Sequence, residues 1–486
     1  MMGRQAKQTQ WWSDPVNVFA RIPEDHILRR LNQILNLDFI RTELRGKYGR
    51  NGQVSVDPVV IMKMMLLLFL DDVKSERELM RIIPLRLDYL YFLGYGLEDV
   101  IPDHSVLSKA RKRWGKEVFE RLFVRTVEQC WRAGLVGGDK VHIDASLIRA
   151  DASLNSVVVV EQTMSKLSED VEQATGPERS ERKPTKKGGP VNEGRLVKTD
   201  PDSTVVRHRT GKSVPSYKNH RVLDDLAGVT TAVETTTGAV HDSSKLIDLV
   251  EQHTGNVGGK PRAAVGDSAY GTSSNFIALA ERGIRAHVSD LRSRQNNVRQ
   301  QGIYDVAEFI YDAASDTFSC PAEEVLTRHH YHAGRGYYEY RTARGVCAKC
   351  PLRAECTRDK AGRTLKRYAG QELLDRARRQ SHGPAARRDR KRRQWLQERN
   401  FGEAAVQHGF KRARWRGLWR QQIQDLLIAA LQNLRIYIRR AGSGGAVVAG
   451  VVLNLLLALI RPSETGFFPL RRLRALNLPL ALGSVG

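Results

Sequence analysis

The sequence predicts an α/β protein in which an all-helical N-terminal domain precedes a mixed β-sheet with helices on its faces. Three observations support this fold class. Residues 1–135 contain only helical patterns, and residues 141–148 alternate apolar and polar side chains with the period of a strand. Between residues 217 and 266 follow a hairpin, a crossover helix and a further strand. Such an order of elements is typical of a mixed sheet.

The composition favours a partner with many negative charges. The chain has 486 residues and a formal net charge of +24 at pH 7, so we expect two to four domains and a polyanion as partner. Nucleic acid is the first candidate and a membrane surface the second. Residues 1–12 lack the apolar region of a signal peptide, and four of the five cysteines are clustered. We therefore expect a cytoplasmic protein rather than a secreted disulfide scaffold.

The N-terminal helices have clear start signals. Asp57 and Pro58 open an apolar helix over residues 59–70, which we expect to be buried. Residues 75–78 match a capping box and open a second helix, which stops near Pro84. Residues 88–93 are a short aromatic segment.

A third, basic helix begins at residues 102–105 and carries Lys109, Arg111, Lys112 and Arg113. Two short helices followed by a basic one are compatible with a DNA-binding helix-turn-helix-like unit. They are equally compatible with a plain helical bundle that has a solvated basic face.

Asp144 lies in the middle of the predicted strand, between apolar neighbours. A carboxylate at such a place is costly unless another group compensates its charge. One interpretation is an edge-strand Asp paired with Lys or Arg. The other is a metal ligand, which requires further carboxylates elsewhere in the chain.

Residues 157–266 consist of a polar segment followed by a segment with strand and helix patterns. Residues 157–215 are polar, with few large apolar side chains, and predict a mobile insertion with little core. Structure resumes with a hairpin over 217–223 and 229–236, a helix over 243–252 and a buried-type strand over 262–266.

Asp267 stands at the carboxyl end of this last strand, where ligands of open α/β sheets gather. The alternative is an Asp that caps a helix.

A third carboxylate has to come from a helix after the basic segment 387–393, where Glu398 and Glu403 qualify. Three converging carboxylates repel unless cations neutralise them, and their hard oxygen atoms select Mg²⁺ or Mn²⁺. Two such ions about 4 Å apart suit attack on a phosphodiester.

Residues 271–385 interrupt the α/β pattern and contain four cysteines, spaced C-x26-C-x2-C-x5-C: Cys320, Cys347, Cys350 and Cys356. A four-cysteine zinc site would hold together a segment with little core of its own. The alternatives are reduced cysteines without metal, or a redox pair. His329, His330 and His332 lie in the same segment and are expected at the surface or against DNA rather than as ligands.

The C-terminal region predicts two helices and a tail. Residues 394–407 have helical propensity, and residues 421–440 form an amphipathic helix. The tail, 441–486, is Gly-rich and then apolar over 446–460, a run that falls short of a transmembrane span.

Several short motifs occur in one order along the chain. They lie at residues 75–79, 102–105, 141–146, 150–153, 217–218, 241–243, 266–271, 398–402 and 414–418. In these motifs, over most of residues 15–440, the chain resembles the DDE transposases of bacterial insertion sequences. The resemblance is to the group with a helical N-terminal domain and a ribonuclease H-like core.

This resemblance implies that Asp144, Asp267 and Glu398 are the catalytic carboxylates and bind two Mg²⁺ or Mn²⁺ ions. Glu398 is chosen over Glu403 because Phe and a small residue follow it at +3 and +4, as in the family. The family often has Lys seven residues after the glutamate and Arg four residues before it. Here these places hold Ala405 and Gln394, with Arg393 one position away.

The resemblance also implies a domain plan and a function. The ribonuclease H-like core would comprise residues 136–270 and 386–440, with 271–385 inserted before the last catalytic helix. The activity would be metal-dependent cleavage and transfer of DNA strands at the ends of an insertion sequence. A homodimer would bind double-stranded DNA in the bacterial nucleoid, without a membrane.

The alternatives are a decayed, non-catalytic DNA-binding protein and a nuclease that never joins strands. We expect DNA contacts from the helix 104–115 and from the basic surface of residues 387–416. The candidate residues are Lys109, Arg111, Lys112, Arg113, Arg388, Arg392, Arg393, Lys411, Arg412, Arg414 and Arg416.

Overall fold

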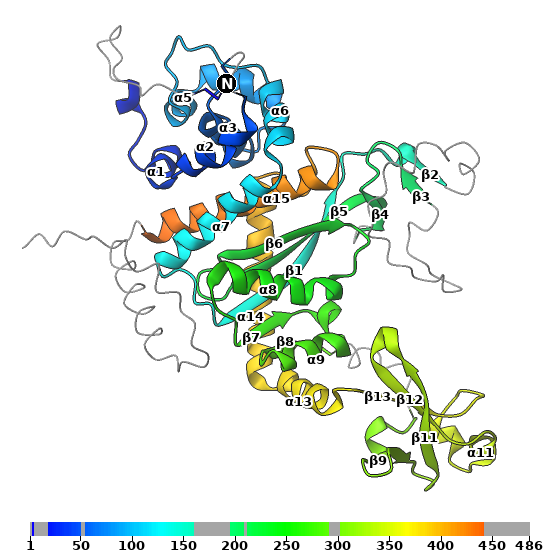
Figure 1. The fold of residues 1–486 in the computed structure, drawn as a ribbon. Helices are drawn as coiled ribbons and strands as arrows, with labels where there is room; N and C mark the ends of the chain where they lie inside the picture. The colour runs from blue at the N-terminus through cyan, green and yellow to red at the C-terminus, as the bar shows by residue number, and fades with distance from the viewer. Residues whose placement is uncertain are drawn as a thin grey trace, which may run out of the picture.

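The computed structural model describes residues 2–3, 18–49, 54–159, 195–208, 211–290 and 302–441. They form a helical part, a central six-stranded sheet with helices, and a small unit built on a five-stranded sheet (Figure 1). The predicted α/β class is therefore confirmed. The predicted tail beyond residue 441 lies outside the described residues, and so do residues 160–194 and 209–210 of the predicted polar insertion.

The described N-terminal residues are helical, as predicted. The Asp57 carboxylate accepts a hydrogen bond from the Val59 amide at 2.9 Å, and the Ser75 hydroxyl accepts one from the Glu78 amide at 3.1 Å. Both expected helix starts are thus confirmed by their caps. The helices are α1 (Ile27–Ile34), α2 (Asp38–Leu44), α3 (Pro58–Leu70), α4 (Glu76–Ile82), α5 (Leu87–Leu93), α6 (Ser105–Trp114) and α7 (Glu117–Arg132).

These helices do not form a core of their own. Their apolar side chains share one cluster with the C-terminal helix α15 (Leu418–Ala441), including the buried Ile423, Leu427 and Leu431. In Figure 1, α7 and α15 lie side by side beneath the other helices, and the sheet follows below them. The core of the N-terminal helices therefore does not end near residue 135, where the sequence predicts the end of the helical domain. It also includes side chains of α15, the last described helix.

The central sheet has the strand order β4-β5-β1-β7-β8, and β6 pairs with β5. The predicted hairpin is formed by β5 and β6, and β1 lies between β5, with which it is antiparallel, and β7, with which it is parallel. The strand that carries Asp144 is therefore central, and its interpretation as an edge strand is wrong. The bounds are β1 (Lys140–Arg149), β4 (Thr204–Arg207), β5 (Ser213–Asp224), β6 (Thr230–Thr237), β7 (Ala263–Gly266) and β8 (Arg285–Val288).

The structure shortens the predicted insertion 271–385 at both ends. Strand β8 pairs in parallel with β7, and helices α9 (Ser273–Glu281) and α13 (Gln371–His382) pack against it. Buried apolar residues of these elements, such as Phe276 and Leu374, share one core with Val141 of β1. The sequence did not reveal this because a four-residue strand leaves little periodic signal.

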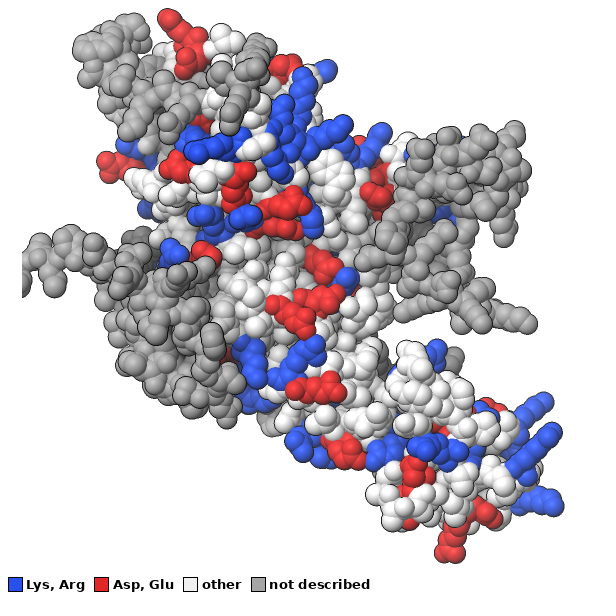
Figure 2. Space-filling view, viewed as in Figure 1, with Lys and Arg blue, Asp and Glu red and all other residues white. Residues whose placement is uncertain are grey.

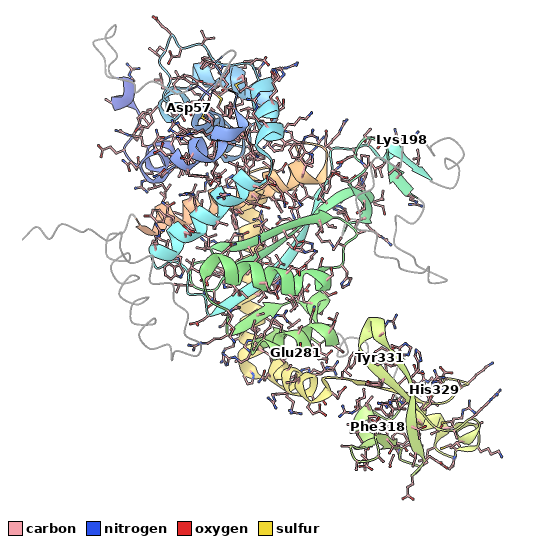
Figure 3. All side chains as sticks on the ribbon, viewed as in Figure 1. Asp57, Lys198, Glu281, Phe318, His329 and Tyr331 are labelled. Atoms are coloured by element: carbon pink, nitrogen blue, oxygen red, sulfur yellow. The ribbon has the colours of Figure 1, made fainter. Side chains whose placement is uncertain are left out.

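Between α9 and α13 stands the small β unit. Its sheet has the order β13-β12-β11-β10-β9 and packs around a few aromatic and aliphatic side chains. Its elements are β9 (Ile310–Asp312), β10 (Thr317–Ser319), β11 (Val325–His332), β12 (Tyr337–Arg341), α11 (Val346–Lys349), α12 (Arg353–Cys356) and β13 (Thr364–Tyr368). Figure 3 labels Phe318 of β10 and, on β11, His329 and Tyr331.

The described ends of the polar insertion 157–215 are also more ordered than expected. Strand β2 (Val157–Val159) pairs with β3 (Arg195–Val197), and β4 extends the central sheet. The remaining helices are α8 (Leu246–Val257), which follows a short 3₁₀ turn over Asp242–Lys245, and α14 (Pro384–Gln407). The basic segment 387–393 is part of α14. No helix in the described ranges is long and apolar enough to cross a membrane, and the apolar run 446–460 falls outside them.

A buried polar network joins α14 and α15 to the hairpin. The fully buried Arg221 of β5 donates hydrogen bonds to Asn400 Oδ1 at 2.8 Å and Gln432 Oε1 at 2.6 Å. Asp425 of α15 accepts one from Thr235 Oγ1 at 2.6 Å. Burial lowers the pKa of Arg221 to about 10 and raises the pKa of Asp425 to about 6, and the attraction between their charges opposes both shifts.

The pKa of Asp425 gives stability a defined pH dependence. The pKa of Asp425 is about 6 in the folded state and about 3.9 in the unfolded state. As the pH falls, the folded protein therefore binds a proton at Asp425 before the unfolded protein does, and this binding stabilises the folded state. The resulting stabilisation is complete below about pH 4 and is lost as the pH rises through about 6. When the pH is lowered from 7 to 4.5, we expect the free energy of unfolding of the wild type to increase by about 1–3 kcal/mol relative to that of the Asp425→Asn variant. Urea unfolding of both proteins across this range measures the difference, and a constant difference would contradict the prediction.

Candidate active site

Asp144 lies on β1, and Asp267 directly follows β7, the strand that pairs in parallel with β1. In the β1–β7 register His142 is opposite Val265, and two residues further along each strand lead to Asp144 and Asp267. Neighbouring strands lie about 4.8 Å apart, and the charge of Asp267 acts on Asp144. The structure therefore brings these two predicted site residues together at the carboxyl end of β7.

The Asp144 carboxylate is held by a cation of α14. Its Oδ2 accepts a hydrogen bond from Arg393 Nη1 at 2.6 Å, and its Oδ1 accepts one from the Ala145 amide at 2.8 Å. Burial raises the pKa of Asp144, and the charge of Asp267 raises it further, whereas Arg393 lowers it. The predicted pairing of Asp144 with a Lys or Arg is thus confirmed, although its strand is central. The side chain is still 27 % exposed and can be reached from solvent.

Asp267 caps a short 3₁₀ turn over Ser268–Tyr270. Its Oδ1 accepts a hydrogen bond from the Ala269 amide at 2.9 Å. The predicted capping role is confirmed, and it does not exclude a role as ligand, because an ionised carboxylate has about four acceptor sites on two oxygens.

A third carboxylate near these two was not among the predicted site residues. Asp242 accepts a hydrogen bond from Lys218 Nζ at 2.8 Å. The buried Tyr270 lies close enough to sense the charges of Asp242, Asp144 and Asp267, which add to the rise of its pKa caused mainly by burial. Asp242 and Lys218 belong to two of the motifs shared with transposases, but only the packing of β5 against the turn before α8 places them here.

Glu398 is placed differently from the two aspartates. It is exposed on α14, and its Oε1 accepts a hydrogen bond from Gln394 Nε2 at 3.0 Å. The adjacent Gln397 faces the sheet and donates to the His142 carbonyl of β1 at 2.8 Å. Within the described residues, no three His, Cys, Asp or Glu side chains are placed to hold a metal ion. Convergence of all three carboxylates therefore stays a prediction.

The competing glutamate, Glu403, is engaged by another helix. Its Oε1 accepts a hydrogen bond from Arg439 Nη2 of α15 at 3.2 Å and lies 4.0 Å from Arg435 Nη1. These contacts fix Glu403 against α15, which supports the choice of Glu398.

Two of the predicted DNA contacts are wrong, because the side chains are buried. Arg111 is 3 % exposed, pairs with Glu76 and lies 3.8 Å over the ring of Trp415. The Arg414 side chain is 9 % exposed and pairs with Asp72. Both arginines join the helical part to the loop before α15.

Arg393 forms an ion pair with Asp144, and its contact with DNA stays a prediction. The remaining candidates are exposed: Lys109, Lys112, Arg113, Arg388, Arg392, Lys411, Arg412 and Arg416. Figure 2 shows Lys and Arg side chains gathered over the helical part of the face in view, and acidic side chains across its middle.

The exposed cations of the loop before α15 lie beside the end of β1. Lys411 Nζ donates to the Ser146 hydroxyl at 2.5 Å, and Arg416 Nε donates to the Asp151 carbonyl at 3.0 Å. Arg412 Nη2 lies 3.4 Å from Asp151 Oδ1. Because Ser146 is two residues beyond Asp144 on the same face of β1, these cations border the aspartate pair.

The predicted zinc ligands are also gathered by the fold. Cys320, Cys347, Cys350 and Cys356 line one small cavity in the β unit and are present as free thiols. His329 and His330 are exposed on β11, and His332 is bonded to Glu339, as expected of residues that are not ligands.

The Asp144–Arg393 pair can be tested by a double-mutant cycle. We expect a coupling energy of about 1–3 kcal/mol between Asp144→Asn and Arg393→Gln in urea unfolding, because the two groups are partly buried and in direct contact. Arg388→Gln, an exposed arginine on the same helix, serves as control, and its effect should stay within about 0.5 kcal/mol. Additivity of the two substitutions would show that the pair does not form.

Comparison with known protein families gives two matches. Residues 16–113 match the transposase domain DUF772, and residues 319–438 match the transposase DDE domain. No curated protein matches the chain. The first match covers the helices through most of α6, and the second runs from the small β unit to α15 and includes Glu398, whereas Asp144 and Asp267 lie between the two. Two transposase-domain matches in this order support a DDE transposase of an insertion sequence.

Proposed function

We propose that the protein cleaves DNA at the ends of an insertion sequence and transfers the strands to a target, with Asp144, Asp267 and Glu398 as metal-binding carboxylates. The observation that carries this proposal is the position of Asp144 on β1 and of Asp267 directly after β7, the strand that pairs in parallel with β1. It occurs in a chain whose flanking segments match transposase domains.

The sheet supports a ribonuclease H-like core. Strands β1, β5 and β6 follow one another as an antiparallel meander, and β7 and β8 continue the sheet in parallel on the other side of β1. Helix α14 packs against β1 from the far end of the sequence. We propose that this strand order, β6-β5-β1-β7-β8, is the core that the resemblance implies.

The aspartate pair fits a hard divalent cation. Two carboxylates on adjacent strands repel each other, and burial makes ionisation of Asp144 harder still, so a positive charge between them is favourable. Carboxylate oxygens are the ligands that Mg²⁺ and Mn²⁺ prefer. Bound by these carboxylates, such ions would supply activation of the attacking water or 3′-hydroxyl and stabilisation of the leaving oxygen.

The chain's own residues supply the remaining parts of the mechanism. Asp144 is held rigidly by its central strand, and Arg393 neutralises part of its charge. Lys411, bonded to Ser146, stands where a phosphate next to the aspartates would pass. We propose that Glu398 completes the ligand set when its side chain turns from Gln394 toward the aspartates. Glu398→Gln should then reduce cleavage far more than Glu403→Gln.

The proposed partner is double-stranded DNA at the element ends and at the target. Arg111 of α6 packs on Trp415 of the loop 411–416, and we propose that the exposed lysines and arginines of these two segments form one basic surface beside the aspartates. We propose that a homodimer binds DNA through this surface, because strand transfer requires two element ends to be brought together.

The catalytic role is tested by Asp144→Asn. The amide is nearly isosteric but a far poorer ligand for a hard cation, so strand cleavage with Mg²⁺ should fall by at least about 10³-fold. Affinity for DNA should stay the same or rise, because a negative charge near phosphates is removed. Cleavage of a labelled DNA that carries the element ends, with binding measured in parallel, provides both readouts.

The matched control is Asp248→Asn, an exposed aspartate on α8, which should cleave like the wild type. Equal cleavage by Asp144→Asn would contradict the proposed role. A wild type that binds DNA but never cuts would be the decayed alternative, and cutting without joined products would indicate a nuclease.

DNA binding should depend steeply on salt. Each phosphate that the protein neutralises releases counterions, so removing one such cation should make the slope of log affinity against log salt shallower by about 0.9. The double variant Lys109→Gln/Lys112→Gln removes two exposed cations of α6. The control Lys260→Gln/Arg262→Gln removes two exposed cations next to β7 and should leave the slope unchanged. An equal slope for wild type and both variants would show that α6 does not face DNA.

A further inference from the structure

Four cysteines from three turns of the small β unit meet around one cavity. Cys320 follows β10 in a tight turn, where its carbonyl accepts a hydrogen bond from the Glu323 amide at 2.8 Å. Cys347 lies in α11, Cys350 directly follows it, and Cys356 ends α12. All four line a cavity of about 20 Å³, which is the space of roughly one small ligand atom.

The walls of this cavity are built closely around the thiols. A Cβ at residue 362 would come within 2.9 Å of Cys347 Sγ, and Gly362 has φ +101°, so a side chain there is excluded by both space and backbone. Arg363 Nη1 donates to the Cys356 carbonyl at 3.2 Å, and its guanidinium lies over Phe309 at 5.3 Å. Backbone and side chains thus hold the segment after α12 against the cysteines.

The four thiols influence one another electrostatically. Burial raises the pKa of Cys356, and the charges of Cys320, Cys347 and Cys350 raise it further, while Arg363 lowers it. Four thiolates so close together repel, and they can all be ionised only if a cation lies between them. Thiolates are soft ligands, so a cation that lies between them would have to be a soft or borderline one.

The small β unit has a small apolar core. Its core consists of five buried side chains, namely Phe309, Phe318, Leu326, Tyr340 and Leu365. A unit of this size gains too little from apolar burial to order its turns, and such units are commonly stabilised by a metal or by disulfides. A metal bound by Cys320, Cys347 and Cys356 would connect the turns that contain these residues and so stabilise them.

We infer that Cys320, Cys347, Cys350 and Cys356 bind one Zn²⁺ as a tetrahedral, purely structural site. Each thiol releases its proton to solvent, and each thiolate donates an electron pair to the ion at about 2.3 Å. In the described structure no three of these sulfurs are yet placed to hold a metal, so they must close on the ion through changes of χ1. Four sulfur ligands leave no open position for catalysis. The site is separate from the aspartate pair, and the inference does not rest on the proposed function.

The test is the zinc content of the full-length protein. After purification from zinc-supplemented medium, wild type and Cys130→Ser should each retain about one zinc per chain, whereas Cys347→Ser and Cys350→Ser should retain less than about a fifth of that. Cys130 is the matched control, because it is the fifth cysteine and is buried on α7. Equal zinc in all four proteins would overturn the inference.

A second measurement uses the wild type alone, so the inference can be tested even if the cysteine variants do not fold. Replacement of zinc by Co²⁺ should give the intense sulfur-to-metal charge-transfer absorption of a tetrahedral thiolate site. Chelation should speed proteolysis within residues 302–368 and leave the central sheet intact. A wild type without zinc and without the cobalt spectrum, or one with thiols paired as disulfides, would show that the cysteines have no metal-binding role.

Discussion

The pairing of β1 with β5 on one side and with β7 on the other is the interaction on which the rest of the structure depends. It places Asp144 opposite Arg221 and, by register, beside Asp267. Directly opposed residues of an antiparallel pair project from the same face, so one face of β1 and β5 carries the partly buried negative charge of Asp144 and the fully buried positive charge of Arg221. The element that covers this face has to satisfy both. Helix α14 does so with Arg393 for Asp144 and Asn400 for Arg221.

This requirement explains why the end of the chain returns to the middle of the sheet. A buried guanidinium without partners is strongly destabilising, and besides Asn219 on the same strand the partners of Arg221 come from α14 and α15. The apolar face of α15 completes the core of the N-terminal helices. The helical part, the basic loop 411–416 and the aspartates are thereby held in one packed body. The exposed lysines and arginines of α6 are thus fixed relative to the aspartate pair.

The ion pair of Asp144 with Arg393 links structure to the proposed chemistry. Burial raises the pKa of the Asp144 carboxyl group, and the Arg393 guanidinium opposes this rise. A divalent ion at the same carboxylate would have to compete with Arg393 or share Asp144 with it, and Arg393 displaced from Asp144 would be available to a phosphate. The position of Arg393, one residue before Gln394, places this cation on the sheet-facing side of α14, while Gln394 and Glu398 lie on its exposed side.

The sequence alone determined the features that depend on local patterns. The caps at Asp57 and Ser75, the strand of Asp144, the hairpin and the strand end at Asp267 follow from period, capping chemistry and turn residues. The sequence also shows that four cysteines lie within one segment, whereas the tertiary structure places them around one cavity. Only the tertiary structure decided which charges are buried: Arg111 and Arg414 look like surface arginines in sequence, yet they pack on Trp415 and Asp72. It also decided that residues 271–290 and 371–382 belong to the central part and that Glu398 points to solvent. The physical reason is that burial and side-chain partners depend on which distant elements pack together, and a helix or strand pattern contains no information about its neighbours.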